Sequence, residues 1–211
     1  MFIMGTNKTK DKILKCALRL FNEKGVSQVS LRTISTDMGI SLGNLTYHFK
    51  KREEIIDALY LALVSKLDNA INKELDVKNQ FELLFKIPGI TISSFYEYRF
   101  LMLDFVYITR NHAMIRKHYQ KLMVQREHQF ESLLNNLIDA KLLRKEIIEN
   151  EYKYLFKNLR IVSDFWLSAT SIDKNSLIRK KDVLEGSQLL KNMIFPYLTT
   201  KGHKAFLELN K

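Results

Sequence analysis

Four residues in one short stretch, Gly43, Asn44, Tyr47 and His48, have the chemistry needed to read DNA. The Asn44 amide can form two hydrogen bonds with the edge of an adenine, and Tyr47 and His48 can reach phosphates or a thymine methyl group. Glycine at position 43 lets a backbone approach a partner closely because it has no Cβ. Helical spacing would place all four on one face. This arrangement is typical of base recognition in the major groove.

The stretch that must position this face reads as two short helices joined by a tight turn. Ser30 has the side chain of a helix N-cap, and Leu31, Ile34 and Met38 follow at helical spacing on one inward face. Gly39 can adopt the left-handed conformation that ends a helix. The pattern therefore predicts a first helix that begins after the serine and ends before the glycine.

A second helix is predicted from Leu42 to His48, with Ser41 as its N-cap. Leu42, Leu45 and Phe49 recur at i, i+3 and i+7, so we expect all three to face the core. The polar face described above would then point outward. Two helices joined in this way form a helix-turn-helix, whose second helix lies in the major groove of DNA. The alternative is an ordinary helix pair with no DNA partner.

Positive charge is concentrated around this motif. The 211 residues carry a formal net charge of +11. Residues 1–52 hold ten Lys or Arg against three Asp or Glu, a balance of +7, whereas the remaining chain holds 24 against 20, a balance of +4. Such a concentration is expected where phosphates are neutralised. A protein that binds membrane surfaces is the alternative, but its charge would lie along one long basic amphipathic helix.

Other chemistry was sought and not found in the sequence. The five histidines form no HExxH pair, and there is no phosphate-binding glycine loop or nucleophile elbow. We therefore expect no catalytic residue, no metal site and no cofactor, and an enzyme is the weakest alternative. Cys16 cannot form an internal disulfide, and its place on an apolar stripe predicts a buried, inert thiol.

The composition favours an all-α chain, since it has only two prolines and seven glycines. Beyond the two short helices, hydrophobic periodicity predicts helices over residues 9–24, 52–71, 80–86, from about 90 to 109, 113–142, 149–171 and 181–197. A break between the third and fourth of these is expected at Pro88 and Gly89. The apolar runs are too short to span a bilayer, so we expect a cytoplasmic protein with no membrane partner.

Residues 9 to about 60 resemble the DNA-binding domain of the TetR family of bacterial transcriptional regulators. The resemblance rests on Lys24-Gly25, Ser30-Leu31-Arg32, Gly39-Ile40-Ser41 and the run Gly43-x-Leu45-x-Tyr47-His48-Phe49. It implies that DNA is bound by Ser30, Arg32, Ser41, Leu42, Gly43, Asn44, Tyr47, His48, Lys51 and Arg52. Two departures from the family pattern stand out: Thr46 occupies a position that is usually tyrosine, and Lys51 replaces the usual helix-capping residue.

The resemblance also implies an all-α homodimer with a three-helix helix-turn-helix domain at residues 1–52 and a connecting helix at residues 52–75. Residues 76–211 would form a larger helical domain for dimerisation and for a small-molecule ligand. Gly186 and Ser187 could admit a partner helix. A four-helix dimer bundle would then be completed by Leu189, Leu190, Met193 and Ile194.

A ligand pocket is the second candidate site. Phe100 and Tyr107 belong to an aromatic-rich segment that can line a cavity or form ordinary core. Asp104 interrupts an apolar run, and Arg126 is the single charge on the stripe of the next helix. We hypothesise that these two face one interior, as an ion pair or as polar ends of a pocket; the alternative is that each reaches solvent. Trp166 completes the predicted lining.

The residues predict a DNA-binding protein, and the family resemblance implies a transcriptional repressor that binds a pseudo-palindromic operator as a dimer. A ligand in the C-terminal domain would favour a conformer that moves the two recognition helices off their operator spacing. The alternative within DNA binding is an architectural protein of the same fold that has no small-molecule ligand.

Overall fold

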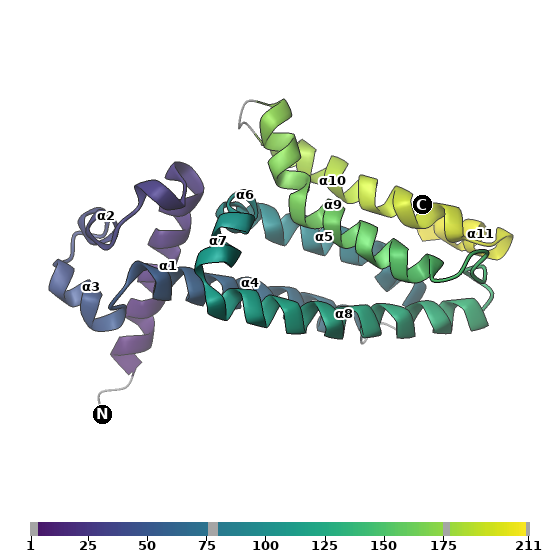
Figure 1. Ribbon diagram of the computed structural model, residues 1–211, viewed down its shortest axis with the longest axis horizontal. Helices are drawn as coiled ribbons and strands as arrows, with labels where there is room; N and C mark the ends of the chain where they lie inside the picture. The colour runs from purple at the N-terminus through teal and green to yellow at the C-terminus, as the bar shows by residue number, and fades with distance from the viewer. Residues whose placement is uncertain (1–3, 76–79, 175–177, 210–211) are drawn as a thin grey trace. The chain divides into compact units, whose positions relative to one another are not determined.

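All the regular structure in the described residues is helical. The computed structural model describes residues 4–75, 80–174 and 178–209. Its helices are α1 (Met4–Lys24), η1 (Val26–Gln28), α2 (Leu31–Asp37), α3 (Leu42–His48), α4 (Arg52–Leu75), α5 (Gln80–Glu97), α6 (Arg99–Leu103), α7 (Phe105–Asn111), α8 (Ala113–Asp139), α9 (Glu151–Asp173), α10 (Lys180–Ile194), η2 (Phe195–Tyr197) and α11 (Thr200–Leu209) (Figure 1). No strand occurs within these ranges, and the predicted all-α class is confirmed.

The chain packs as two compact units. Unit 1 comprises Met1–Ser65 and Tyr98–Lys117, and unit 2 comprises Lys66–Glu97 and His118–Lys211. The packing boundaries therefore fall inside α4, between α5 and α6, and inside α8, and they differ from the predicted domain limits at residues 52 and 76. Residue 76 lies outside the described residues, and the predicted functional division into domains stays a prediction.

Unit 1 has its core between α1, the two short helices, the first half of α4, and α6. Its fully buried apolar side chains include Ile13, Ala17, Phe21, Ile34, Leu45, Ile55, Ile56 and Phe100. The rings of Phe21 and Phe100 stack with centroids 5.0 Å apart. The Phe100 backbone N–H also donates to Asn22 Oδ1 at 3.1 Å. These contacts fasten α6 to α1.

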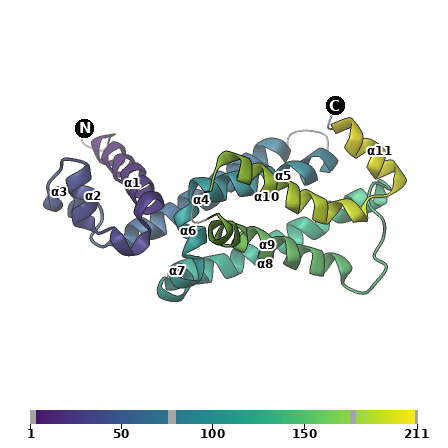
Figure 2. The ribbon, with the colours of Figure 1, turned by 90° about the horizontal axis from the view of Figure 1, so that it is seen from above.

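Unit 2 is built from helices that lie side by side, with α10 against both α5 and α9 (Figures 1 and 2). Its core cluster comprises Phe81, Leu84, Phe85, Leu134, Leu137, Leu143, Ile194 and Leu198. Leu190 is buried as well. Four residues were expected to complete a dimer bundle, and this was wrong for Leu190 and Ile194, which are buried inside their own chain. Leu189 is 44% exposed and Met193 is half-buried, and their place in a dimer stays a prediction.

The expected helix break at Pro88 was wrong. Helix α5 continues from Gln80 to Glu97 with Pro88 inside it. Proline removes one backbone hydrogen bond, but packing against α10 holds the helix together across that point. A Cβ added to Gly89 would lie 3.4 Å from Ser187 Oγ of α10, so small residues allow this close crossing. The breaks come later instead, at Tyr98 and Asp104, and divide the expected aromatic helix into three.

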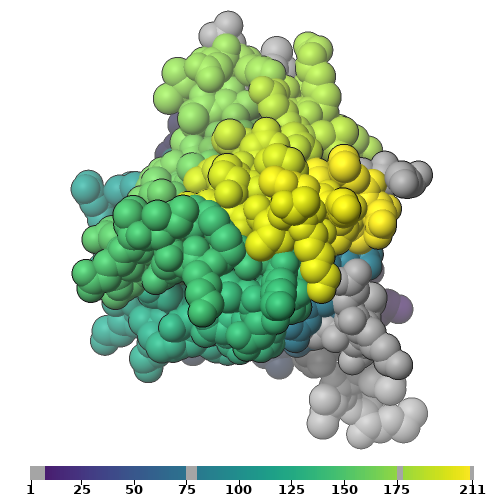
Figure 3. All heavy atoms as spheres, turned by 90° about the vertical axis from the view of Figure 1, so that its right-hand side faces the viewer, coloured from purple at the N-terminus to yellow at the C-terminus, as the bar shows by residue number. Residues whose placement is uncertain are grey.

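The chain after residue 197 forms a helix that periodicity did not predict. Helix α11 packs at the end of unit 2 where α8 connects to α9 (Figure 3). The Thr199 N–H donates to the Leu142 carbonyl at 3.0 Å, and the Arg144 N–H donates to the Tyr197 carbonyl at 2.9 Å. A Cβ on Gly202 would lie 2.2 Å from the Leu142 carbonyl oxygen, so only glycine fits this contact.

Candidate nucleic-acid interface

The helix-turn-helix is shaped by local capping, as its sequence predicts. The Ser30 hydroxyl accepts the Thr33 N–H at 3.1 Å, and Thr33 Oγ1 accepts the Ser30 N–H at 3.4 Å. Gly39 has a φ of 64°, the left-handed conformation expected of a helix stop. The Ile40 N–H then donates back to the Ser35 carbonyl at 3.0 Å. The turn is thereby fixed before any DNA is bound.

The second helix, α3, begins at the cap formed by Ser41, whose hydroxyl accepts the Asn44 N–H at 3.1 Å. Leu45 is fully buried and Phe49 is nearly so, which confirms that these two face the core. Leu42 was expected beside them, but its side chain is 39% exposed. The first turn of α3 projects beyond the core, so the Leu42 side chain lies on the outer surface with the other residues assigned to DNA.

The outer face of α3 is open to a partner. Gly43 and Asn44 are exposed, and Tyr47 is 76% exposed. The His48 ring packs edge-on to the Tyr47 ring with centroids 5.2 Å apart, so the two aromatic side chains form one surface. Apart from Ser41 Oγ at 3.9 Å, nothing lies within 4 Å of a Cβ added to Gly43. Packing within the protein therefore does not require a glycine at this position.

The basic residues around the motif have different environments. Arg32 and Lys51 are exposed and can reach phosphates. Arg52 was expected to do the same, but its guanidinium donates to the carbonyls of Val26 and Val29 at 3.1 and 3.4 Å. Arg52 therefore ties the start of α4 to the segment before α2. A DNA phosphate would have to compete with these two carbonyls for the Arg52 guanidinium, so its role in DNA binding stays a prediction.

The two departures from the family pattern have structural counterparts. Thr46 Oγ1 donates to the Gly43 carbonyl at 3.1 Å, so this side chain is used within α3. Lys51 supplies no cap, but the Lys50 N–H donates to the Glu54 carboxylate at 2.9 Å. A carboxylate in the first turn of α4 also suits the helix dipole. Glu54 thus ties Lys50, which lies before the helix, to the first turn of α4, and this contact differs from a side-chain N-cap.

A group of side-chain contacts between α1 and α2 supports the interface, and it was not predicted from the sequence. Arg19 forms ion pairs with both Glu23 and Asp37. The Arg19 hydrogen bond lowers the pKa of Asp37 below its ordinary value. The Cys16 thiol donates to the same carboxylate at 3.2 Å. Burial, together with this bond, raises the pKa of Cys16 to about 11, so the thiol is protonated and unreactive at neutral pH.

The five residues predicted to line a ligand pocket are divided between the two units. In unit 1, Phe100 is core, Tyr107 is 53% exposed, and Asp104 is half-buried at the junction of α6 and α7. In unit 2, Trp166 packs against Gly186, whose added Cβ would lie 2.5 Å from the indole. Gly186 therefore serves this internal contact. Arg126 is the one predicted residue that lines the cavity described next.

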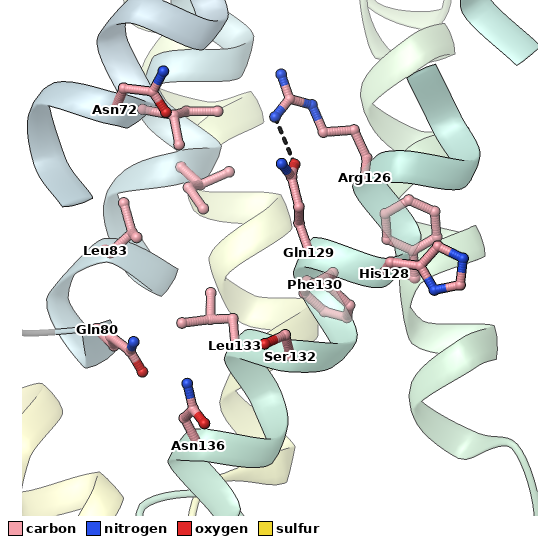
Figure 4. A pocket seen from close by; sticks show the side chains of 13 residues that line it. Asn72, Gln80, Leu83, Arg126, His128, Gln129, Phe130, Ser132, Leu133 and Asn136 are labelled. Carbon is pink, nitrogen blue, oxygen red and sulfur yellow. Dashed lines mark hydrogen bonds between the residues drawn. The ribbon is translucent and has the colours of Figure 1, made fainter. Parts of the chain in front are cut away.

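Unit 2 contains a cavity of about 490 Å³ at α4, α5, α8 and α9. Its size is within the range of small-molecule sites. The described lining residues are Ile71, Asn72, Gln80, Leu83, Ile87, Arg126, His128, Gln129, Phe130, Ser132, Leu133, Asn136 and Phe156 (Figure 4). Apolar side chains form much of the wall, and amides from α4, α5 and α8 are set among them.

The partner of Arg126 is Asp68 on α4, so the predicted pairing with Asp104 was wrong. The guanidinium also donates to Gln129 Oε1 at 2.8 Å. Burial lowers the pKa of Arg126 from its ordinary value, although arginine stays charged at neutral pH. Asp57 and Asp68 are eleven residues apart, three turns along one face of α4, but this spacing did not identify Asp68 as the partner of Arg126.

Asp164 is one of two buried carboxylates in the described part of unit 2, the other being Asp182, and neither was singled out from the sequence. The Asp164 side chain accepts a hydrogen bond from the Tyr119 hydroxyl. Burial raises the pKa of Asp164 to about 6, although the Tyr119 bond and the Arg160 charge oppose that rise. Its neighbours on α9 include Trp166 and Leu167, which are both buried. Asp164 and Tyr119 therefore form a polar contact between α8 and α9.

Two further findings concern other kinds of site. No group of three or more His, Cys, Asp or Glu side chains suited to a metal ion occurs in the part of the chain that the structure describes. Within that part, no helix combines the length and the apolar character needed to cross a bilayer.

Comparison with known families gives matches over both units. The family profile described as "Bacterial regulatory proteins, tetR family" matches residues 13–59. The TetR profile described as "Bacterial transcriptional repressor" matches residues 63–206, which is more than half of the chain.

Individual relatives agree with these matches. The chain is 24% identical over 154 residues to the HTH-type transcriptional regulator AcrR of Shigella flexneri, covering 67% of this chain and 69% of that protein. It is similar in fold to a TetR-family transcriptional regulator from Marinobacter aquaeolei VT8, with a TM-score of 0.82, 23% identity and coverage of 95% and 96%. A putative transcriptional regulator from Saccharomonospora viridis in complex with choline gives a TM-score of 0.72, with 16% identity and coverage of 91% and 98%.

Proposed function

The chain belongs to the TetR family of bacterial transcriptional regulators, and we propose that this DNA-binding regulator is a repressor that binds a pseudo-palindromic operator as a homodimer and is released by a small-molecule effector. The observation that carries the proposal is the outer face of α3, where Leu42, Asn44 and Tyr47 are exposed on a capped helix. Such a face suits the major groove. Because its target is the chromosome, we propose that the protein acts in the cytoplasm.

The exposed side of α9 supports the proposed homodimer. Tyr154, Ile161, Phe165 and Ile172 are exposed apolar side chains at intervals of seven, four and seven residues. These intervals place them along one stripe of the helix. Leu184 on α10 is exposed as well. A second copy is the occupant that we propose, because a two-fold axis lets one stripe pack against itself.

The cavity and α4 together support the proposed release by an effector. Within unit 1, the His112 ring lies 2.9 Å from the Asp57 carboxylate. Within unit 2, Asp68 pairs with Arg126 at the cavity. Both aspartates lie on one face of α4, and the same helix begins directly after the recognition helix. The regulator would have an operator-bound conformer and a released conformer. An effector that binds the released conformer more tightly would favour it and shift α4. A ligand that binds both conformers equally would leave repression intact.

Two alternatives to this function are a TetR-fold protein without an effector and a protein that binds membrane surfaces. A TetR-fold protein without an effector is disfavoured by a cavity of about 490 Å³ that contains both apolar walls and polar groups. Binding to an anionic membrane surface is disfavoured because residues 1–52 hold most of the excess positive charge, +7 of the net +11. The bound choline of the Saccharomonospora viridis protein supports only the general idea that this fold accommodates small molecules.

Selection of bound sequences from a random DNA pool tests the proposal. The purified protein is expected to enrich a near-palindromic motif with half-sites about one helical turn apart, or a simple multiple of that distance. Binding should weaken steeply between two salt concentrations, because phosphate contacts release counterions. Asn44→Ala should relax the preference at one base pair in each half-site, whereas Asn135→Ala, at an exposed site on α8, is the matched control. If no motif is enriched, the proposal is wrong and anionic lipid vesicles become the next partner to examine.

A further inference from the structure

The charge pattern of the unit 2 cavity restricts the effectors that it can accept. Among its described lining residues there is no Asp or Glu, and Arg126 is the one permanently charged side chain. A cationic ligand would find no counter-charge in this lining. Apolar residues such as Leu83, Phe130 and Phe156 offer a surface for a hydrocarbon or ring. The lining therefore suits a molecule that combines an apolar body with a negative head.

The guanidinium of Arg126 is shared between the cavity and α4. It donates to Gln129 at 2.8 Å and pairs with Asp68, yet its side chain is only 23% exposed. The dashed line in Figure 4 marks the Gln129 bond, which holds Arg126 from the cavity side. Arginine has five N–H donors in a planar fork, so it can bind a carboxylate through two of them. An anionic ligand would compete with Asp68 for this fork.

We propose that the effector is an amphipathic carboxylate whose apolar body fills the cavity and whose head binds Arg126 in place of Asp68. The inference rests on the proposed effector-responsive function and adds its chemical class and its trigger. Displacement of Asp68 leaves a carboxylate of α4 without its partner on α8. The half of α4 in unit 2 is then free to shift, and that shift is the response of the regulator.

Matched ten-carbon ligands test the chemical class without any DNA. Decanoate, decanol and decylamine share one tail and differ in the charge of the head. Calorimetric titration should show decanoate binding at least about tenfold more tightly than decanol, as expected for a charge-assisted hydrogen bond. Decylamine should bind more weakly than either, because it meets Arg126 with a like charge.

Two variants separate the trigger from a merely structural contact. Arg126→Gln should abolish the preference for decanoate over decanol. Asp68→Asn should have the opposite effect, raising the affinity for decanoate by about tenfold because the internal competitor is gone. The same variant should lose most of the change in operator affinity that decanoate causes in the wild type. Asp139→Asn, an exposed site at the end of α8, is the matched control and should behave as the wild type.

The outcomes distinguish this inference from the proposed function. Equal binding of decanoate and decanol by a protein that still binds its operator would overturn the anionic effector alone. Weaker decanoate binding by a folded Asp68→Asn variant would overturn the competition between ligand and Asp68. A strong preference for decanoate in a protein that selects no operator would support the carboxylate site and overturn the regulator function.

Discussion

Gly43 and Gly186 are both helical glycines, but the space around them differs. A Cβ at Gly186 would lie 2.5 Å from the Trp166 indole, so packing of α9 against α10 requires the glycine. A Cβ at Gly43 would meet only Ser41 Oγ at 3.9 Å, and the position faces outward on α3. Glycine costs helix stability relative to alanine. Packing within the folded chain therefore does not account for glycine at position 43, and close approach to DNA is the reason that we propose for it.

Gly43→Ala is expected to stabilise the fold and weaken DNA binding. Alanine should raise the free energy of unfolding by about 0.5–1 kcal/mol, because it is the better helix former. The added methyl group should lower operator affinity by about tenfold through steric contact with DNA. Thermal unfolding and fluorescence anisotropy with a labelled operator measure the two effects. Gly186→Ala is the comparison and should destabilise the protein. Unchanged operator affinity in Gly43→Ala would refute the close approach.

At the scale of the elements, the α8–α9 connection shows how unit 2 is held together. Arg144 binds the Glu151 carboxylate through two hydrogen bonds of 2.7 Å, and the Ile147 N–H donates to the same carboxylate at 2.9 Å. The Arg144 guanidinium also lies over the Tyr197 ring, 4.8 Å from its centroid. These contacts join α9 to the connection before it and to η2. The α8–α9 connection is therefore held in one conformation by specific side-chain contacts.

Glu151→Gln should remove an acid-sensitive part of the stability. The Arg144 hydrogen bonds, assisted by the Ile147 N–H, lower the pKa of Glu151 from 4.5 to about 2. Because the folded pKa is the lower one, this stabilisation is complete above about pH 4.5 and is lost as the pH falls towards 2. The variant should be less stable than the wild type at pH 7, and the difference should shrink below pH 4.5.

Urea unfolding at pH 7, 5, 4 and 3 measures this difference. Glu149→Gln, at an exposed site two residues away, is the matched control and should follow the wild type at every pH. A constant gap between Glu151→Gln and the wild type across the series would show that ionisation of Glu151 is not the cause.

At the scale of the whole molecule, regulation depends on surfaces and connections that no single helix contains. The exposed stripe on α9 is proposed to pair with a second copy, which would supply the second recognition helix for the operator. The α4 helix belongs to both units, since the boundary between them falls at Ser65 and Lys66. Asp57 and Asp68 of this helix are each paired within their own unit, and we propose α4 as the route of the effector signal.

Ile161→Glu is expected to convert the dimer to a monomer. Ile161 is 52% exposed on α9, so a charge there should spare the fold of the single chain. A like charge brought together across a two-fold axis opposes association. Light scattering coupled to size-exclusion chromatography should show the mass of one chain, and operator affinity should fall at least about tenfold. Ile147→Glu, at an exposed residue before α9, should remain dimeric. A dimeric Ile161→Glu variant would place the interface elsewhere.

Local features of the fold could be predicted because they depend on neighbours along the chain. The caps at Ser30 and Ser41 act over three residues, and the Gly39 stop needs only its own φ. The helix-turn-helix and the all-α class followed from such signals, and the family resemblance supplied the assignments to DNA. Leu42 was wrongly assigned to the core. Periodicity shows which face of a helix is apolar, but it does not show how far along the helix that face is covered by the core.

Contacts between distant segments needed the tertiary structure. Periodicity could not show that α5 continues through Pro88, because packing against α10 compensates for the lost hydrogen bond. It could not show that Arg126 pairs with Asp68, since the two are 58 residues apart and a charge on an apolar stripe has several possible partners. Which residues share a cavity depends on how helices cross, and that is decided by the packing of all their side chains together.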